Sequence, residues 1–143
     1  MLRDRVLTAL APRRTVHAHC DVPCGIYDPH GAQLAAKTVS RMVVLINENL
    51  GTDVEQRNKL IRSVKVKEDH AELCKRELQI LWSDYFKPEH LEAHPDLHDL
   101  FWKALKQAGK CKQSVDAKAC ADLEAQVDAI AAIFWETKGG KPS

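Results

Sequence analysis

A histidine and two cysteines that could bind one metal ion lie close together near the N-terminus, in the segment His19-Cys20-Asp21-Val22-Pro23-Cys24. The thiolates of Cys20 and Cys24 are four positions apart, and Pro23 and Gly25 favour a bend between them. Such a bend brings both sulfurs to adjacent positions around one ion, next to the His19 imidazole. Because thiols must ionise to bind a metal, the affinity of this site should fall at low pH. The spacing therefore predicts a metal-binding hook.

Cleavage of the chain after Ala18 would add one more donor, the free amino group of His19. This amine, the deprotonated amide nitrogen of Cys20 and the Cys20 thiolate would close two small chelate rings that share the amide. The Cys24 thiolate would complete a plane, and the His19 imidazole could approach it from above. Planar nitrogen and sulfur donors suit Ni(II) or Cu(II), whereas zinc prefers four tetrahedral ligands. The donor set therefore favours nickel or copper.

Residues 1–18 are predicted to be a leader that a maturation protease removes by cutting after Ala18. The leader contains one short apolar stretch, residues 6–11, which is followed by Arg13 and Arg14. A secretory signal needs an apolar region of about 7–15 residues. A twin-arginine signal places its arginine pair before that region, not after it. Export is thus the less favoured alternative, and we expect the protein to be cytoplasmic.

Four helices are expected to position the hook, because the apolar residues beyond residue 30 recur at helical spacing. Gly51 and Gly139 are expected to stop the first and fourth helices, and Thr52 or Asp53 to cap the second. The third is expected to begin at Pro95, since proline is tolerated in a first turn. The expected helices cover residues 34–50, 53–87, 95–109 and 114–138.

These elements predict an all-α fold, an antiparallel up-down four-helix bundle over residues 30–143 with the hook of residues 19–29 outside it. A chain of 143 residues with 45% hydrophobic content can fill one core. A formal net charge of +1 gives no basic field for nucleic acid. No apolar run approaches the roughly 20 residues that span a bilayer, so no membrane partner is expected.

The hook resembles that of the nickel superoxide dismutases, whose mature chains begin His-Cys-Asp-x-Pro-Cys-Gly-x-Tyr-Asp-Pro. All nine specified positions of this pattern are met by residues 19–29. The similarity continues through Trp82-Ser83-Asp84-Tyr85-Phe86-Lys87-Pro88 and ends with Ile133-Phe134-Trp135-Glu136-Thr137-Lys138. It therefore covers essentially the whole chain after the leader.

The resemblance implies a homohexamer of four-helix bundles, each with one nickel ion, that dismutates superoxide by cycling between Ni(II) and Ni(III). It implies that His19 binds nickel through its amine and, in the oxidised state, its imidazole. It implies that Cys20 binds through its amide nitrogen and thiolate, and Cys24 through its thiolate. Asp21 and Tyr27 match positions beside the metal, where Tyr27 would shape substrate access and order water without binding nickel. We therefore expect His19, Cys20, Cys24 and Tyr27 to be the catalytic residues.

Two positions depart from the family pattern. In the family, a glutamate on the first helix and an arginine on the second steady the axial imidazole. This chain has Ala35 and His70 at the corresponding positions. Glu68, Asp69 or His70 could substitute, and the sequence leaves the partner of the His19 imidazole unassigned.

Two other functions stay open at this point. A nickel or copper storage or sensing protein could use the same hook without turnover, and a metal-loaded sample would then lack activity. A metal-free helical interaction module would tolerate serine at both Cys20 and Cys24.

The remaining histidines and cysteines are expected to serve the fold. The three histidines of residues 90–98 are spaced by four, but Pro95 interrupts their helix, which favours a solvated face over a metal site. Cys74 lies among core positions and is expected to be a small buried side chain. A bridge between Cys111 and Cys120 is not expected in a reducing compartment.

Overall fold

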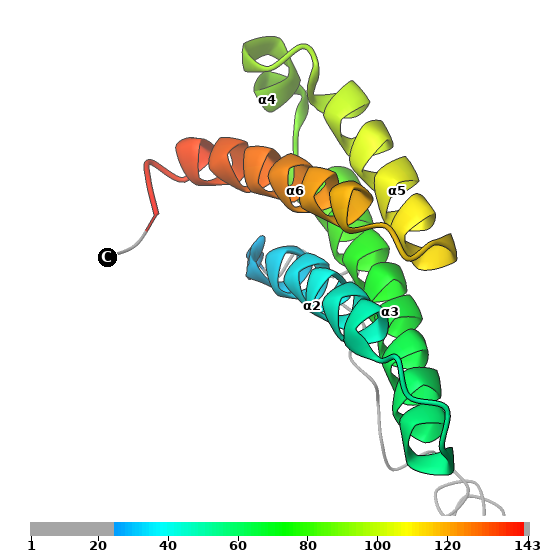
Figure 1. Ribbon diagram of the computed structural model, residues 1–143. Helices are drawn as coiled ribbons and strands as arrows, with labels where there is room; N and C mark the ends of the chain where they lie inside the picture. The colour runs from blue at the N-terminus through cyan, green and yellow to red at the C-terminus, as the bar shows by residue number, and fades with distance from the viewer. Residues whose placement is uncertain (1–24, 142–143) are drawn as a thin grey trace, which may run out of the picture.

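The protein is built from helices joined by short connections, as a computed structural model that describes residues 25–141 shows (Figure 1). No strand occurs within these described residues, so the predicted all-α class is confirmed. The elements are α2 (His30–Glu48), α3 (Val54–Ile80), the π-helical turn η1 (Leu81–Tyr85), α4 (Pro88–Ala93), α5 (Leu97–Gln113) and α6 (Ala117–Thr137).

The four long helices form the predicted antiparallel up-down bundle, in which α2 and α5 each pack against both α3 and α6 (Figure 1). The pairing of α2 with α6 shows the antiparallel direction. Gln33 Nε2 on α2 donates to Asp128 Oδ1 on α6 at 2.6 Å, and further along α2 the Ser40 hydroxyl donates to Glu124. Residue numbers therefore increase along α2 in the direction in which they decrease along α6, so the two helices are antiparallel.

The caps confirm the predicted start of the second helix and correct that of the fourth. The fourth begins at Ala117 with Asp116 as its N-cap, because Ser114, where it was predicted to begin, is the C-cap of α5. The Asp53 carboxylate accepts from the backbone N–H of Gln56 at 2.9 Å, and the Asp116 carboxylate accepts from that of Ala119 at 3.0 Å. Both carboxylates satisfy an N–H group that has no partner inside its own helix, and both lie at the positive end of the helix dipole.

The predicted bounds of the first and third helices are wrong. The first helix begins at His30, four residues earlier than the spacing of large apolar side chains indicates, because the buried Ala32 extends its inner face. The third begins at Leu97, since Pro95 and Asp96 form a turn before it. It also continues through Gly109, where the buried Ala108 and Cys111 continue its inner face and offset the low helix propensity of glycine.

A buried lysine joins α3 to the end of α5. The Lys67 side chain is almost fully buried, and its ammonium donates to the backbone carbonyls of Cys111 at 3.0 Å, Lys112 at 2.6 Å and Ser114 at 2.8 Å. Carbonyls in the last turn of a helix have no partner inside that helix. Lys67 therefore satisfies acceptors that would otherwise be buried without a hydrogen bond.

We expect Lys67→Met to lower the free energy of unfolding by roughly 3 kcal/mol, because it removes a charged donor and leaves buried carbonyls unsatisfied. Lys65→Met is the matched control. Lys65 pairs with Asp69 at 2.6 Å, but its side chain is 73% exposed, so its loss should cost less than about 1 kcal/mol. Urea unfolding followed by circular dichroism measures both, and equal losses would show that the contacts of Lys67 add nothing.

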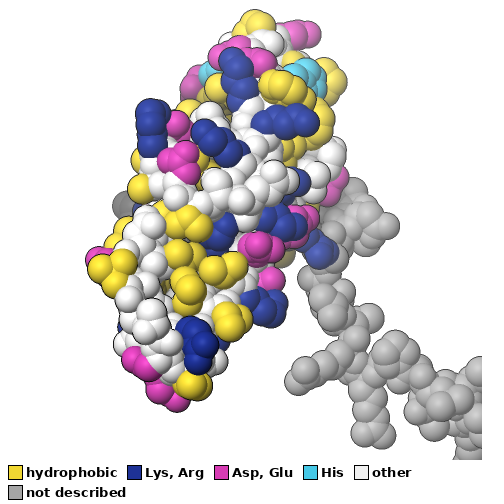
Figure 2. All heavy atoms as spheres, turned by 45° about the vertical axis from the view of Figure 1, so that its right-hand side comes forward, with side chains coloured by type: hydrophobic (Ala, Val, Ile, Leu, Met, Phe, Trp, Pro, Cys, Tyr) yellow, Lys and Arg dark blue, Asp and Glu magenta, His cyan; other side chains and the backbone are white. Residues whose placement is uncertain are grey.

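Several large apolar side chains remain at the surface. Figure 2 shows hydrophobic side chains gathered in the lower half of one face, with most of the charged ones around and above them. Leu34, Leu50 and Ile61 belong to the helical apolar spacing that predicts inner faces, yet each is more than half exposed. Among residues 25–141, no helix combines the length and apolar character that a membrane span needs.

Candidate metal centre

The structure describes the last part of the predicted hook. Tyr27 lies among the described residues, whereas His19, Cys20 and Cys24 lie outside them. Gly25 has φ of +71°, a left-handed conformation that glycine adopts without strain. Asp28 Oδ1 then accepts from the backbone N–H of His30 at 2.7 Å. The chain thus turns directly after the second predicted cysteine ligand and is fixed to the start of α2.

Tyr27 packs into an aromatic cluster built by three other elements. Its ring lies 5.6 Å from that of Tyr85 on η1. The Tyr85 ring in turn stacks on His90 of α4 at 5.8 Å and lies 4.4 Å from Phe134 of α6. The π-helical turn that carries Tyr85 is closed by a hydrogen bond from the Phe86 N–H to the Leu81 carbonyl at 3.1 Å. Such turns are frequent at functional sites.

The hydroxyl of Tyr85 has a defined direction. It lies 2.6 Å from Thr137 Oγ1, and the Thr137 hydroxyl donates to the carbonyl of Phe134, also at 2.6 Å. A threonine hydroxyl has one hydrogen, so the bond with Tyr85 requires Tyr85 to donate. The Tyr85 oxygen keeps lone pairs that can accept from a water molecule, but its proton is already engaged.

These groups border a cavity of about 350 Å³ at the end of the hook. The side chains around it carry two ammonium groups, one carboxylate, an imidazole and three hydroxyls. Its lining residues are Gly25, Tyr27, Asp84, Tyr85, Lys87, His90, Thr137 and Lys138. The cavity is thus continuous with the predicted ligand segment through Gly25 and Tyr27.

Of the eight lining residues, the sequence predicts a role in the site for Gly25, in the bend of the hook, and for Tyr27. The others come from η1, α4, the end of α6 and the residues that adjoin them. The sequence did contain a signal for these residues. Segments 82–88 and 133–138 are similar to the family, and together they supply most of the residues that line the cavity.

The comparisons with known proteins agree with this geometry. The model of the family described as nickel-containing superoxide dismutase matches residues 14–138. The chain belongs to the nickel-containing superoxide dismutase family. It is 43% identical over 131 residues to superoxide dismutase [Ni] of Streptomyces seoulensis, with 90% of this chain and 94% of the relative covered. The corresponding protein of Streptomyces coelicolor is 41% identical over the same length and coverage.

A solved structure supports the fold of this nickel-containing superoxide dismutase. A native nickel superoxide dismutase solved at 1.30 Å superposes with a TM-score of 0.77 and 38% identity, and covers 85% of this chain and 100% of its own. Family and relatives establish nickel as the cofactor and superoxide dismutation as the activity, and do not favour the alternative of a storage or sensing protein.

The described residues of this family member offer no rival metal site. Within residues 25–141, no group of three or more His, Cys, Asp and Glu side chains could hold a metal ion. The evenly spaced histidines contact separate partners. His94 Nε2 lies 3.5 Å from a carboxylate oxygen of Glu136, and His98 Nδ1 accepts from Trp82 Nε1 at 2.8 Å.

The three cysteines outside the hook are buried free thiols. Burial raises the pKa of Cys74 and that of Cys111 to about 12, and it raises the pKa of Cys120 as well. A metal binds the thiolate, and these groups stay protonated at neutral pH. The thiolate chemistry that nickel needs is therefore left to the two cysteines of the hook.

The two departures from the family pattern have different surroundings. Ala35 is buried on the inner face of α2. His70 Nδ1 lies 2.9 Å from the Val66 carbonyl, one turn back on α3. A carbonyl only accepts, so Nδ1 carries the hydrogen, and in the neutral ring Nε2 is then an acceptor. Nδ1 of His70 is thus engaged by the backbone of its own helix.

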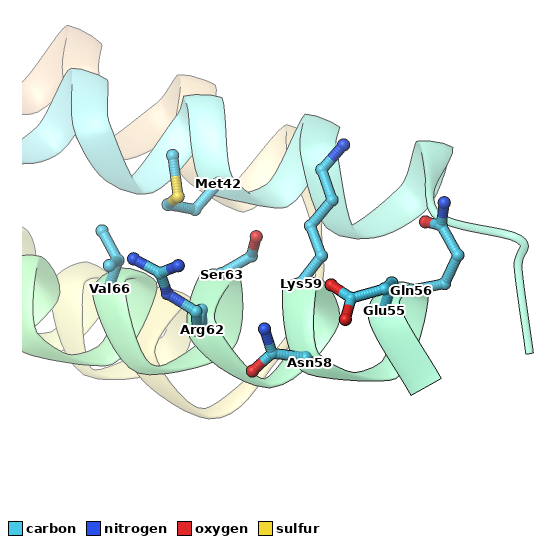
Figure 3. Close-up of a pocket in the computed structure, with 8 residues that line it drawn as sticks. All are labelled: Met42, Glu55, Gln56, Asn58, Lys59, Arg62, Ser63 and Val66. Carbon is cyan, nitrogen blue, oxygen red and sulfur yellow. The ribbon is translucent and has the colours of Figure 1, made fainter. Parts of the chain in front are cut away.

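A second cavity, of about 400 Å³, lies at the other end of α2. Figure 3 shows Met42 extending from α2 towards the side chains of α3. Six of its eight lining side chains are polar, among them Glu55, Lys59 and Arg62, and none carries a thiol or an imidazole. This cavity has no donor set for nickel and shares no lining residue with the cavity at Gly25 and Tyr27.

Proposed function

We propose that this chain dismutates superoxide at a nickel ion held by His19, Cys20 and Cys24, after the leader has been cut off behind Ala18. The balanced reaction is 2 O2⁻ + 2 H⁺ → O2 + H2O2. One observation carries the proposal: the hook motif is complete in the sequence, and two of its described residues, Gly25 and Tyr27, line the aromatic cavity. The donors and the space for substrate are therefore adjacent in the chain.

The chemistry of the donor set suits nickel. When bound, nickel supplies the one-electron redox change that dismutation requires. The anionic Cys20 and Cys24 thiolates and the Cys20 amide nitrogen favour the more highly charged state. The His19 imidazole would add a further donor for that state.

The described residues have separate tasks in this proposal. Tyr27 and Tyr85, packed at 5.6 Å, narrow the cavity and leave room for a small substrate. The Tyr85 oxygen, whose hydrogen points to Thr137, can hold an ordered water molecule by accepting from it. Because the Tyr85 proton is engaged by Thr137, a proton for the reduced substrate would come from that water rather than from Tyr85.

Proteolytic maturation, assembly and location belong to the same proposal. The solved relative is covered over its whole length by 85% of this chain, which fits a leader that is absent after processing. The exposed Leu34, Ile61 and Leu73 give apolar surface for contacts between subunits of a homohexamer. The short apolar stretch of the leader supports a cytoplasmic location.

Native mass spectrometry of the protein purified from its own cells tests these points together. We expect a chain that begins at His19, one nickel ion per subunit and an assembly of six subunits. A nickel-loaded chain that still carries residues 1–18 would contradict the amine ligand. A stable monomer with bound nickel would contradict the hexamer while leaving the hook in place.

A further inference from the structure

Two of the buried cysteines face each other where α5 leads through a short connection into α6 (Figure 1). Cys111 lies in the last turn of α5 and Cys120 in the first turn of α6. Gln107, one turn before Cys111 on α5, donates through Nε2 to the carbonyl of Ala119 at 2.7 Å, and Ala119 directly precedes Cys120. The Cys111 thiol donates a hydrogen bond to the sulfur of Cys120. The two sulfurs are therefore in contact in the folded protein.

Charged groups hold the two helix ends at this spacing. The buried Lys67 ammonium binds the carbonyls of Cys111 and Ser114, one on each side of the end of α5. Lys110 on α5 lies 3.7 Å from the Asp116 carboxylate that caps α6. The ends of α5 and α6 separate only when these contacts break, so the two thiols stay within reach of each other.

The two thiols are chemically unequal. Burial raises the pKa of both, that of Cys111 to about 12. The hydrogen bond that Cys111 donates and the nearby Lys67 ammonium oppose this rise at Cys120, whereas the bond adds to it at Cys111. The thiolate is the form of cysteine that attacks a peroxide. Cys120 is thus the nucleophile of the pair, and Cys111 is the thiol positioned to react with its oxidised form.

We propose that hydrogen peroxide, the product of superoxide dismutation, oxidises Cys120 and that Cys111 then closes a disulfide with it, which joins α5 to α6. The Cys120 thiolate attacks one peroxide oxygen, the O–O bond breaks and hydroxide leaves, which gives a sulfenic acid. The Cys111 sulfur loses its proton and displaces the sulfenic hydroxyl, which leaves as water. Sulfur is oxidised and the peroxide oxygens are reduced: 2 RSH + H2O2 → RSSR + 2 H2O.

The position of the pair makes this reaction respond to an excess of peroxide. Both thiols are buried and protonated at neutral pH, so they react slowly and stay reduced while peroxide is scarce. Peroxide reaches them when the ends of α5 and α6 open locally, which costs less than opening the middle of the bundle. The disulfide closes a loop of about ten residues and restricts the unfolded chain. Oxidation therefore stabilises the bundle when peroxide accumulates.

Peptide mapping tests the bond directly. The nickel-loaded chain that begins at His19 is treated with excess hydrogen peroxide, its free thiols are alkylated in denaturant, and its peptides are identified by mass spectrometry. We expect one linked pair of peptides that contains Cys111 and Cys120, and an alkylated Cys74. The thermal midpoint should rise by about 5 °C in the unchanged protein but not in Cys120→Ala. Dithiothreitol should reverse both changes.

Two single variants test the order of attack. Cys111→Ala should leave Cys120 as a sulfenic acid, which dimedone labels, whereas Cys120→Ala should leave Cys111 as an unlabelled thiol. Cys74→Ala is the matched control, because Cys74 is equally buried but has no hydrogen-bonded thiol partner among residues 25–141. It should form the bond between α5 and α6 like the unchanged protein. Labelling of Cys111 in Cys120→Ala, without labelling of Cys120 in Cys111→Ala, would overturn the assignment of the nucleophile.

The proposal is overturned if Cys111 and Cys120 both remain alkylatable after peroxide treatment of the folded protein. It is equally overturned if the bond forms only after unfolding in urea, or if Cys111 pairs with Cys74 on α3. These outcomes are independent of the nickel site, because added peroxide takes the place of the enzyme's product. A hook that failed to retain nickel would leave the bond between α5 and α6 unchanged.

Discussion

The full-length chain of 143 residues is expected to fold its helical bundle but to bind nickel weakly and to be nearly inactive. In this form the nitrogen of His19 is a peptide amide joined to Ala18. It lacks the basic lone pair of an amine, and deprotonation of a second, adjacent amide costs far more than that of the first. Loss of about 3 kcal/mol of binding free energy corresponds to roughly 100-fold weaker nickel binding.

Cleavage after Ala18 should switch on metal binding and activity together. A chain that begins at His19 should take up one nickel ion per subunit and dismutate superoxide. A chain with a single extra residue before His19 is the sharpest control, because it keeps every side chain of the hook and lacks only the free amine at the right place. It should be nearly as impaired as the full-length chain.

Three measurements separate these forms. Metal analysis after gel filtration gives the nickel content, a superoxide assay gives the activity, and circular dichroism shows that all three chains are equally helical. An uncleaved protein as active as the trimmed one would show that the amine is not a ligand. The coordination by His19 and Cys20 would then have to be revised.

The helical order of the bundle could be predicted because its signals are local. Asp53 and Asp116 cap the helices that follow them, and the apolar spacing gives each helix its inner face. The buried and exposed faces could not be predicted exactly, because helical spacing of large apolar side chains does not show which of them are buried. The inner face of α2 instead includes Ala32, Ala35 and Ala36, whose small side chains let the helices approach closely, while Leu34 faces outward.

The irregular segments show a further limit of the sequence. The short helix α4 and the turn η1 were not expected. Pro88 stops one helix, as predicted, but it also begins α4 at its first position. The turn η1 depends on a hydrogen bond across five residues that no spacing of apolar side chains indicates.

The candidate site likewise has one part that the sequence predicts, the hook, and one part that it does not, the cavity. The hook could be predicted because its three ligand residues lie within the six positions 19–24 and belong to a motif of nine specified positions. The cavity could not, because the fold assembles it from distant segments. Tyr85 and Thr137 are hydrogen-bonded across 52 positions of sequence, and only the packing of η1 against α6 brings them together. The charges of Lys87 and Lys138 meet at this cavity for the same reason.

Serine at either hook cysteine should abolish both nickel retention and dismutation. A serine hydroxyl is neutral at the pH of the cell and does not replace a thiolate on nickel. We expect Cys20→Ser and Cys24→Ser each to reduce activity by at least about 100-fold, since each loses a ligand and roughly 3 kcal/mol of binding free energy. Nickel content and activity should fall together in both variants.

Cys74→Ala is the control that distinguishes a ligand from a structural thiol. Cys74 is fully buried on α3, and its raised pKa keeps it protonated. Its replacement should leave nickel content and specific activity unchanged and lower the free energy of unfolding by about 1–2 kcal/mol, the cost of a small cavity. Because the hook precedes the bundle in the chain, Cys20→Ser should show the opposite result, full stability without nickel. Equal loss of activity in all three variants would mean that the hook cysteines have no special role.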